Sequence, residues 1–360
     1  MTLISHDSLF GKNAFFNNPE YKEDLKKEFN NLKASCSYQS AQKTEKNITP
    51  SLGYLFKRLS KWSILPAVAR PKNFGSILAS DTSNWKYKRI TMPIDGLSID
   101  VAIMGRPSTL SNKKWILCSA GRNELYEDQM TSKVFKSFLE SINSNAILFN
   151  YPKIGASTGP RNGKNMVTAY KAVLELLEDE RNGIGAKKII GYGYSMGGGV
   201  QGKALNTHSL EAGMKKGIQY LFIKDRTFSS LKRAIHSLSK GFIGNSIPLF
   251  GWDLCSMDSS KKLTKLQIPE IIVQTTDKND EPNSDGVISK NASLKKAILE
   301  SSLSHKFYVN IPNYNQDNLH ACSMDCFSKE LSEKVNLLIG DKEKTIYFAW
   351  ISKIFHRLTS

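Results

Sequence analysis

The pentapeptide GYSMG at residues 193–197 constrains the fold more than any other feature, because of the segments on either side of it. Residues 187–192 (KKIIGY) have the pattern of a short buried strand, and residues 196–205 have that of a helix of small residues. A serine between a strand end and a helix start, with glycine two positions before and after it, fits a sharp strand-to-helix turn. The glycines tolerate strained backbone and let the helix approach the sheet closely. The pattern predicts an α/β fold that presents Ser195 at the end of a strand.

Two interpretations of Ser195 follow from this turn. In the first, Ser195 is a catalytic nucleophile, and the N-terminus of the following helix stabilises negative charge on a substrate oxygen. In the second, the turn is a structural feature rich in glycine, and the serine caps the helix. The strand–turn–helix setting favours the catalytic interpretation.

The chain has 360 residues, which is enough for one large domain and an extension. Residues 1–85 carry helical patterns without a clear motif, and we expect a helical N-terminal extension there. The main domain is expected to span residues 86–360. Within it, residues 232–262 concentrate apolar side chains near glycines, and they form either a lid or a helix pair packed on the core. A lid would favour an acyl chain or another hydrophobic ester.

From residue 85 onward, short apolar runs alternate with helix-length segments. Two β-patterned runs surround Asp95-Gly96, a pair typical of a hairpin turn. The strand-like runs are residues 87–93, 97–104, 115–118, 146–150, 189–194, 220–223, 271–274 and 307–311. We therefore expect an eight-stranded, mostly parallel sheet with helices on both faces. Ligands of such sheets bind beyond the carboxyl ends of the strands, where the residues of catalytic type fall.

A net charge of +17 is typical of proteins that bind nucleic acids or anionic membranes, so both are considered as partners. The lysines are scattered, and no nucleic-acid-binding signature is present, so nucleic acid is not an expected partner. Residues 52–68 mix basic and apolar positions, so this segment either lies on an anionic membrane surface or docks on the main domain. Docking is the favoured interpretation.

The cysteines and the start of the chain bear on its compartment. The five cysteines form no CxxC pair and no His/Cys ligand spacing, so we expect reduced thiols and no structural metal. The sequence has no run of about 18 apolar residues, which a spanning helix would need. The first residues lack the regions of a secretory signal. The expected location is the cytoplasm.

Several segments resemble the α/β-hydrolase superfamily over roughly residues 86–338. NYPKIGASTG at residues 150–159 resembles the loop after the fourth strand of that fold, and IPEIIVQ at residues 268–274 resembles the entry to its seventh. Together with GYGYSMGG and DRTFSSL, the first segment is similar to a poorly characterised hydrolase family of Chlamydiae and Legionella, which includes SidB-type effectors. The resemblance implies an α/β-hydrolase fold and, as an alternative location, a host cell reached without a cleavable signal peptide.

A serine hydroxyl needs a base within hydrogen-bond reach to act as a nucleophile. His320 follows the last predicted strand, where the superfamily carries its base, whereas His305 precedes that strand. The acid should follow the seventh strand. Asp277 is nearest to the strand end, and Asp285 is followed by Val-Ile and a helix, as in the superfamily. Asp285 is slightly favoured over Asp277, with Asp280 third.

The oxyanion hole is expected to use the backbone N–H of Met196 and a second N–H from Gly121 or Arg122. The loop around Gly121 reads SAGRNE and lacks the His-Gly pair usual in the superfamily. Three roles stay open for the Arg122 side chain. It forms an ion pair with Glu124, forms one with Asp128, or meets an anionic group of the substrate.

The sequence thus predicts a serine hydrolase, similar to esterases or lipases, that cleaves a small-molecule or lipid ester or a thioester through an acyl-enzyme. This chemistry needs no cofactor and no metal. The alternative is a catalytically silent hydrolase fold that binds a protein or a lipid surface. The missing His-Gly pair, the basic charge and the amphipathic segment favour this alternative.

Overall fold

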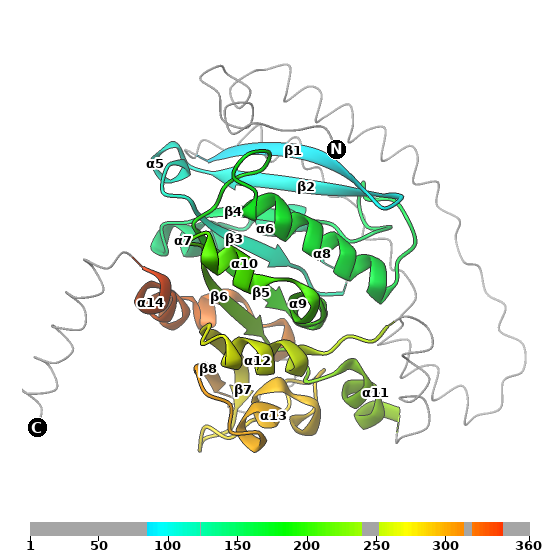
Figure 1. Ribbon diagram of the computed structural model, residues 1–360. Helices are drawn as coiled ribbons and strands as arrows, with labels where there is room; N and C mark the ends of the chain where they lie inside the picture. The colour runs from blue at the N-terminus through cyan, green and yellow to red at the C-terminus, as the bar shows by residue number, and fades with distance from the viewer. Residues whose placement is uncertain (1–84, 123, 240–251, 313–318, 341–360) are drawn as a thin grey trace, which may run out of the picture.

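The computed structural model of the chain describes residues 85–122, 124–239, 252–312 and 319–340 (Figure 1). The predicted N-terminal extension, the amphipathic segment and the middle of the predicted lid lie outside these residues. The division into an extension and a main domain therefore stays a prediction. None of the described helices has the length and the apolar character needed to cross a membrane.

The described residues form one eight-stranded sheet. Its strands are β1 (Lys86–Ile94), β2 (Leu97–Gly105), β3 (Lys114–Ser119), β4 (Asn145–Phe149), β5 (Lys188–Tyr194), β6 (Gln219–Asp225), β7 (Glu270–Thr276) and β8 (Lys306–Pro312). Their order in the sheet is β1-β2-β4-β3-β5-β6-β7-β8. The pairs β1–β2 and β2–β4 are antiparallel, and all pairs from β4 to β8 are parallel. The predicted eight-stranded, mostly parallel sheet is confirmed.

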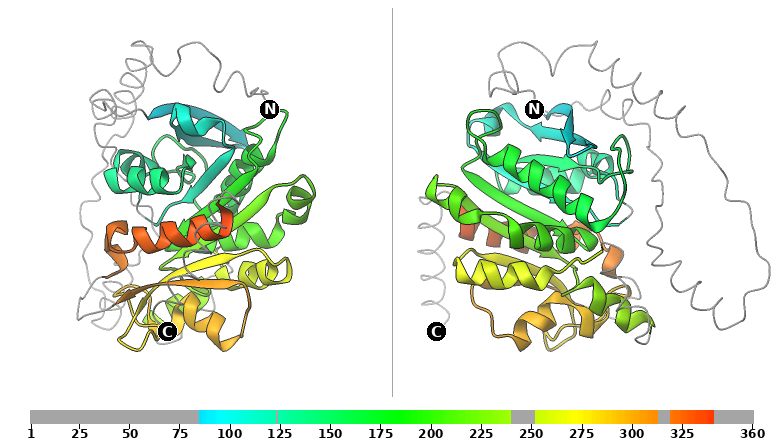
Figure 2. Two further views of the ribbon diagram at one scale, coloured as in Figure 1. Left: turned by 90° about the vertical axis from the view of Figure 1, so that its left-hand side faces the viewer. Right: turned by 45° about the vertical axis from the view of Figure 1, so that its right-hand side comes forward.

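Helices cover both faces of this sheet (Figure 2). One face packs against α6 (Tyr126–Thr131), α7 (Lys133–Ser141) and α14 (Ser328–Ile339). The other packs against α8 (Gly163–Glu178), α9 (Met196–Thr207) and α12 (Ser256–Lys265). The other described helices are α5 (Pro107–Leu110), α10 (Leu210–Lys215), α11 (Leu231–Ser239), α13 (Leu294–Glu300), and the 3-10 turns η3 (Lys290–Ala292), η4 (Leu319–Ala321) and η5 (Met324–Cys326).

Strand β3 shows why the central strands read as continuous apolar runs. Trp115 and Leu117 point into the core beside α8 and α9, and Ile116 and Cys118 point into the core beneath α6, α7 and α14. Successive side chains of a strand face opposite sides of the sheet, so a strand covered on both sides needs apolar residues at every position. The positions of the central strands can therefore be predicted from the continuous apolar runs in the sequence.

Strand β6 is longer than the predicted residues 220–223, because its last residues are buried although they are charged. The ammonium group of Lys224 lies 3.5 Å from a carboxylate oxygen of Glu270 and donates to the hydroxyl of Ser259 at 2.6 Å. A charge is tolerated in a core only with such partners. A prediction from hydropathy alone therefore places the end of this strand too early.

Candidate active site

Ser195 occupies the sharp turn between β5 and α9 in strained backbone, with φ 51° and ψ −116°. A non-glycine residue in this region costs about 1–3 kcal/mol and persists only where its surroundings hold it. Its N–H donates to the carbonyl of Asp225 at 2.9 Å, and its carbonyl accepts from the hydroxyl of Thr227 at 2.6 Å. At Gly197, a Cβ atom would stand 2.0 Å from the carbonyl oxygen of Ser119, so only glycine lets α9 approach β3 this closely.

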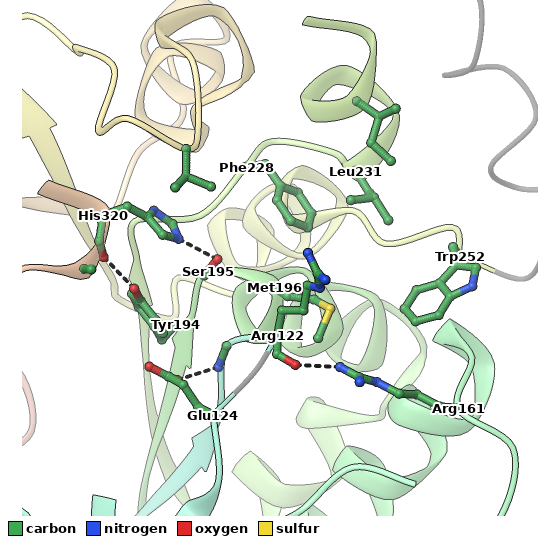
Figure 3. A pocket seen from close by; sticks show the side chains of 14 residues that line it. Arg122, Glu124, Arg161, Tyr194, Ser195, Met196, Phe228, Leu231, Trp252 and His320 are labelled. Atoms are coloured by element: carbon green, nitrogen blue, oxygen red, sulfur yellow. Dashed lines mark hydrogen bonds between the residues drawn. The ribbon is translucent and has the colours of Figure 1, made fainter. Parts of the chain in front are cut away.

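The structure brings Ser195, His320 and Asp285 together in a chain of hydrogen bonds. The Nε2 atom of His320 lies 2.8 Å from the hydroxyl oxygen of Ser195 (Figure 3). The Nδ1 atom of His320 lies 2.7 Å from Oδ2 of Asp285. A carboxylate on Nδ1 holds the proton there and leaves Nε2 free to accept the serine proton. All three residues come from loops at the carboxyl ends of strands.

The carboxylate of Asp285 is buried and fixed by its own loop. Its Oδ1 atom accepts the N–H groups of Val287 at 2.9 Å and Ile288 at 2.7 Å. Its carbonyl accepts the N–H of His320 at 2.8 Å, so backbone and side chain both join the two loops. These bonds orient the carboxylate toward the imidazole.

The other acidic candidates have different partners in the loop after β7. Oδ1 of Asp277 accepts the N–H groups of Asn279 at 2.9 Å and Glu281 at 3.1 Å. Oδ1 of Asp280 accepts from the side chain of Asn310 at 3.1 Å. These two aspartates shape the loop, and Asp285 is the one bonded to the histidine. His305 directly precedes β8, at the end of the sheet opposite to His320.

The loop that carries His320 is held by Arg226, a residue to which the sequence analysis gave no role. The Nη1 atom of Arg226 donates to the carbonyls of Leu319 at 3.1 Å, His320 at 2.9 Å and Cys322 at 2.8 Å. Its Nε and Nη2 atoms donate to the two carboxylate oxygens of Asp225 at 2.7 and 2.9 Å. The segment DRTFSSL contains this pair directly after β6, but its acceptors lie 93–96 residues away.

Tyr194 adds a further bond to the same loop. Its hydroxyl donates to the carbonyl of His320 at 2.5 Å, and its ring lies under the guanidinium of Arg226 at 4.8 Å. The residue that precedes Ser195 thus touches the loop that supplies the histidine. The two strand ends are tied together around the candidate site.

A cavity of about 360 Å³ opens beside the hydroxyl of Ser195, and we name it the Ser195 cavity (Figure 3). One wall is apolar and consists of Met196, Phe228, Leu231, Ile235, Trp252 and Val287. The polar part contains Arg122, Glu124 and Arg161. Ile235 and Trp252 belong to the predicted lid, whose residues 240–251 lie outside the described chain. The cavity can take an apolar chain and a polar group.

The backbone N–H groups expected to form an oxyanion hole differ in whether they already have an acceptor. Met196 is the first residue of α9, so its N–H has no acceptor within the helix. The N–H of Gly121 donates to Oε2 of Glu124 at 2.7 Å. Burial raises the pKa of this Glu124 carboxyl, and the N–H of Gly121 lowers it by a smaller amount. Arg122, the neighbour of Gly121, lines the cavity, and burial lowers the pKa of its guanidinium.

Residues 68–336, more than half of the chain, match the family described as "Chlamydia CHLPS protein (DUF818)". The chain belongs to this family. The Chlamydiae part of the resemblance is thereby confirmed, and the relation to SidB-type effectors stays a prediction. No curated protein matches the sequence.

Solved structures share the fold at low sequence identity. An α/β hydrolase from Vibrio vulnificus has a TM-score of 0.54 and 14% identity, covering 80% of this chain and 95% of that chain. An esterase from Pyrococcus furiosus has a TM-score of 0.50 and 12% identity, covering 71% of this chain and 92% of that chain. The family member described here therefore has the α/β-hydrolase fold.

Proposed function

We propose that the protein is a serine hydrolase that cleaves a carboxylic ester or thioester through an acyl-enzyme. The observation that carries this proposal is the chain of hydrogen bonds from Ser195 through His320 to Asp285, beside a cavity with an apolar wall. An esterase and an α/β hydrolase among the structures of similar fold support the same class of reaction.

In the proposed reaction, the hydroxyl of Ser195 attacks the carbonyl carbon while its proton passes to Nε2 of His320. Asp285 stabilises the imidazolium that forms. The bond between the acyl carbon and the leaving oxygen or sulfur then breaks, and His320 returns the proton to the leaving group. Water, deprotonated by the same imidazole, hydrolyses the acyl-enzyme. No cofactor or metal takes part in these steps.

Two backbone N–H groups would stabilise the oxyanion. The first is that of Met196, where the N-terminus of α9 also favours negative charge. The second would come from Gly121 or Arg122; the N–H of Gly121 donates to the Glu124 carboxylate at 2.7 Å, so its use would require that bond to break. Met196 also lines the cavity, as Arg122 does, which brings both residues close to the serine.

The substrate that fits best is an ester with an apolar acyl chain. Phe228, Leu231 and Trp252 form part of the cavity wall that such a chain would cover. Burial of apolar surface contributes about 25 cal/mol per Å², so a wall of this kind selects for acyl chains longer than acetyl. A small-molecule ester and a single-chain lipid both meet this description.

One observation favours the second candidate function, a catalytically silent fold that binds a protein or a lipid surface. The carboxylate of Glu124 accepts the backbone N–H of Gly121, in the loop where ester hydrolysis would need a free N–H donor for the oxyanion. A negative charge at that place opposes the negative charge of the reaction intermediate. The two candidates differ in one measurable property, which is turnover.

The test measures hydrolysis of p-nitrophenyl esters from acetyl to octanoyl by the wild type and by Ser195→Ala. We expect kcat to fall by at least about a thousandfold in Ser195→Ala, as for other triad serines. The matched control is Ser209→Ala, an exposed serine directly before α10 whose side chain makes no capping bond. It should keep the wild-type rate. A wild type that cleaves no ester of the series would instead establish the silent alternative.

A further inference from the structure

Two arginines, Arg122 and Arg161, line the Ser195 cavity, and the hydrogen bonding of Arg161 is incomplete among the described residues. Nη2 of Arg161 donates to the carbonyl of Arg122 at 2.6 Å. The Nε and Nη1 atoms of Arg161 are buried and have no hydrogen-bond partner in the part of the chain that the structure describes. Figure 3 shows the Arg161 side chain on the side of the cavity away from His320, below Trp252. Three N–H groups of one guanidinium, one on Nε and two on Nη1, are therefore without an acceptor among the described residues.

Leaving such a cation unpaired is unfavourable for the fold. Burial lowers the pKa of Arg161, and the positive charge of Arg122 lowers it further. A buried donor without an acceptor costs about 1–3 kcal/mol, and more when it carries a charge. The fold gains one backbone hydrogen bond from this side chain and leaves the rest of its donors unused.

The acidic side chain in the cavity does not balance the charge of the two arginines. Glu124 is the acidic residue among the described residues that line the cavity. Its carboxylate accepts from the backbone N–H of Gly121 at 2.7 Å. With two arginines and one glutamate among the described lining residues, the polar part of the cavity has a formal excess of positive charge.

We propose that Arg161, with Arg122 beside it, binds an anionic group of the substrate, a carboxylate or a phosphate monoester. This proposal rests on the proposed function and names the substrate class: an ester whose apolar part covers Phe228 and Trp252 and whose acyl chain or alcohol carries the anion. A guanidinium binds carboxylate and phosphate oxygens through charge-assisted N–H···O hydrogen bonds, which are stronger than bonds between neutral groups. Among the described residues, Nε and Nη1 of Arg161 have no acceptor, and because their N–H groups diverge, each would bind a separate oxygen.

The arrangement also accounts for selectivity against neutral esters. A site built to hydrogen-bond a substrate group disfavours the analogue without that group, because the polar atoms of the site then stay unpaired. A neutral ester would fill the apolar wall of the Ser195 cavity and leave Arg161 as it is in the free protein. An anionic ester would supply the missing acceptors.

The experiment compares p-nitrophenyl hemiglutarate with p-nitrophenyl pentanoate, two esters of equal acyl length that differ in the terminal carboxylate. The readout is the ratio of their kcat/KM values, which cancels effects common to both substrates. We expect the wild type to prefer the anionic ester by about tenfold or more, which is the size of one charged hydrogen bond. A second pair, a monoacylglycerol phosphate and the same monoacylglycerol, tests the phosphate in the same way.

Arg161→Gln should bring these ratios close to one. Arg181→Gln, which removes an exposed arginine outside the cavity, is the matched control and should leave them unchanged. Because Arg161 also holds the carbonyl of Arg122, the absolute rates can fall, and only the ratio tests the proposal. Arg161→Lys, which keeps a charge without the planar fork, should retain part of the preference.

A binding measurement separates this inference from the proposed function. Glutarate and inorganic phosphate are titrated into Ser195→Ala with and without Arg161→Gln, with thermal stability as the readout. Stabilisation by either anion that disappears with Arg161→Gln supports the anion site even if no ester is turned over. Neutral esters cleaved as fast as anionic ones by the wild type would overturn the inference and leave the hydrolase proposal intact. Equal anion binding with and without Arg161 would overturn it as well.

Discussion

Arg226 and Arg161 lie close to the same candidate nucleophile, yet their guanidinium groups have opposite surroundings. Every nitrogen of the Arg226 guanidinium has an acceptor: Nε and Nη2 bind Asp225, and Nη1 binds three backbone carbonyls. The guanidinium also lies over the rings of Tyr194 and Phe327, at 4.8 and 5.2 Å. Arg161 has one backbone acceptor within the described chain and two nitrogens that have none there.

The difference separates a residue that holds the fold from one that is set up for a ligand. Arg226 joins the end of β6 to the loop of His320, and its partners are complete before any substrate arrives. Arg161 has no described partner for two of its nitrogens, so its interactions can become complete only with a molecule from outside. The two side chains therefore predict different results for the same substitution.

The largest effect is expected for Arg226→Met. It leaves the buried carboxylate of Asp225 without its ion partner, and breaking a buried pair in this way costs about 3–5 kcal/mol. The free energy of unfolding from urea denaturation measures the loss. Arg161→Met, which removes one backbone hydrogen bond, should change it by about 1 kcal/mol or less.

A double substitution shows whether the uncompensated charge is the cause. Asp225→Asn combined with Arg226→Met should cost less than Arg226→Met alone, because no buried charge is left behind. Equal losses for Arg226→Met and Arg161→Met would break the comparison, since both arginines would then have the same role in the fold.

A smaller effect is expected for Tyr194→Phe, which belongs to the same structural region as Arg226. It removes the hydroxyl that donates to the carbonyl of His320 and keeps the ring under the guanidinium. One hydrogen bond of this kind contributes about 1 kcal/mol, so stability should fall by that amount and kcat by a few-fold. The kcat values of the neutral and the anionic ester should fall together. A fall confined to the anionic ester would assign Tyr194 to the substrate instead.

The smallest effect concerns pH and the carboxyl of Glu124 in the polar part of the cavity. Burial raises its pKa above the ordinary value of 4.5, so the folded state binds the proton more tightly than the unfolded state. This contribution to stability is complete below the ordinary pKa and is lost as the pH rises through the raised pKa of the folded state. The wild type should therefore lose stability relative to Glu124→Gln as the pH rises in this range, as measured by denaturation at several pH values. A difference that stays constant with pH would show that burial does not shift this group.

The fold could be predicted from the sequence because its causes are local and repeated. A strand such as β5, buried on both faces, must be apolar at successive positions. The glycines around Ser195 indicate the sharp turn, because larger residues would not fit there. The histidine could be chosen because only His320 follows the last strand closely. These features depend on neighbours in the chain.

The rest depends on contacts between distant residues, which no local pattern encodes. Asp277, Asp280 and Asp285 share one loop, and the bond to His320 distinguishes them only once two loops have met. Arg226 binds backbone carbonyl groups, and every residue has one, so the sequence does not indicate which residues accept its hydrogen bonds. The same holds for Arg161, whose position beside Arg122 arises from residues 39 apart.

The central claim is that Ser195 is the nucleophile and that His320 and Asp285 activate it. The most direct measurement is covalent labelling with a fluorophosphonate, followed by mass spectrometry to find the modified residue and by the rate of its modification. The account predicts one adduct on Ser195, no adduct in Ser195→Ala, labelling slowed at least about a hundredfold in Asp285→Asn, and an unchanged rate in Asp277→Asn. An adduct on another residue, or equal labelling rates for Asp285→Asn and the wild type, would contradict it.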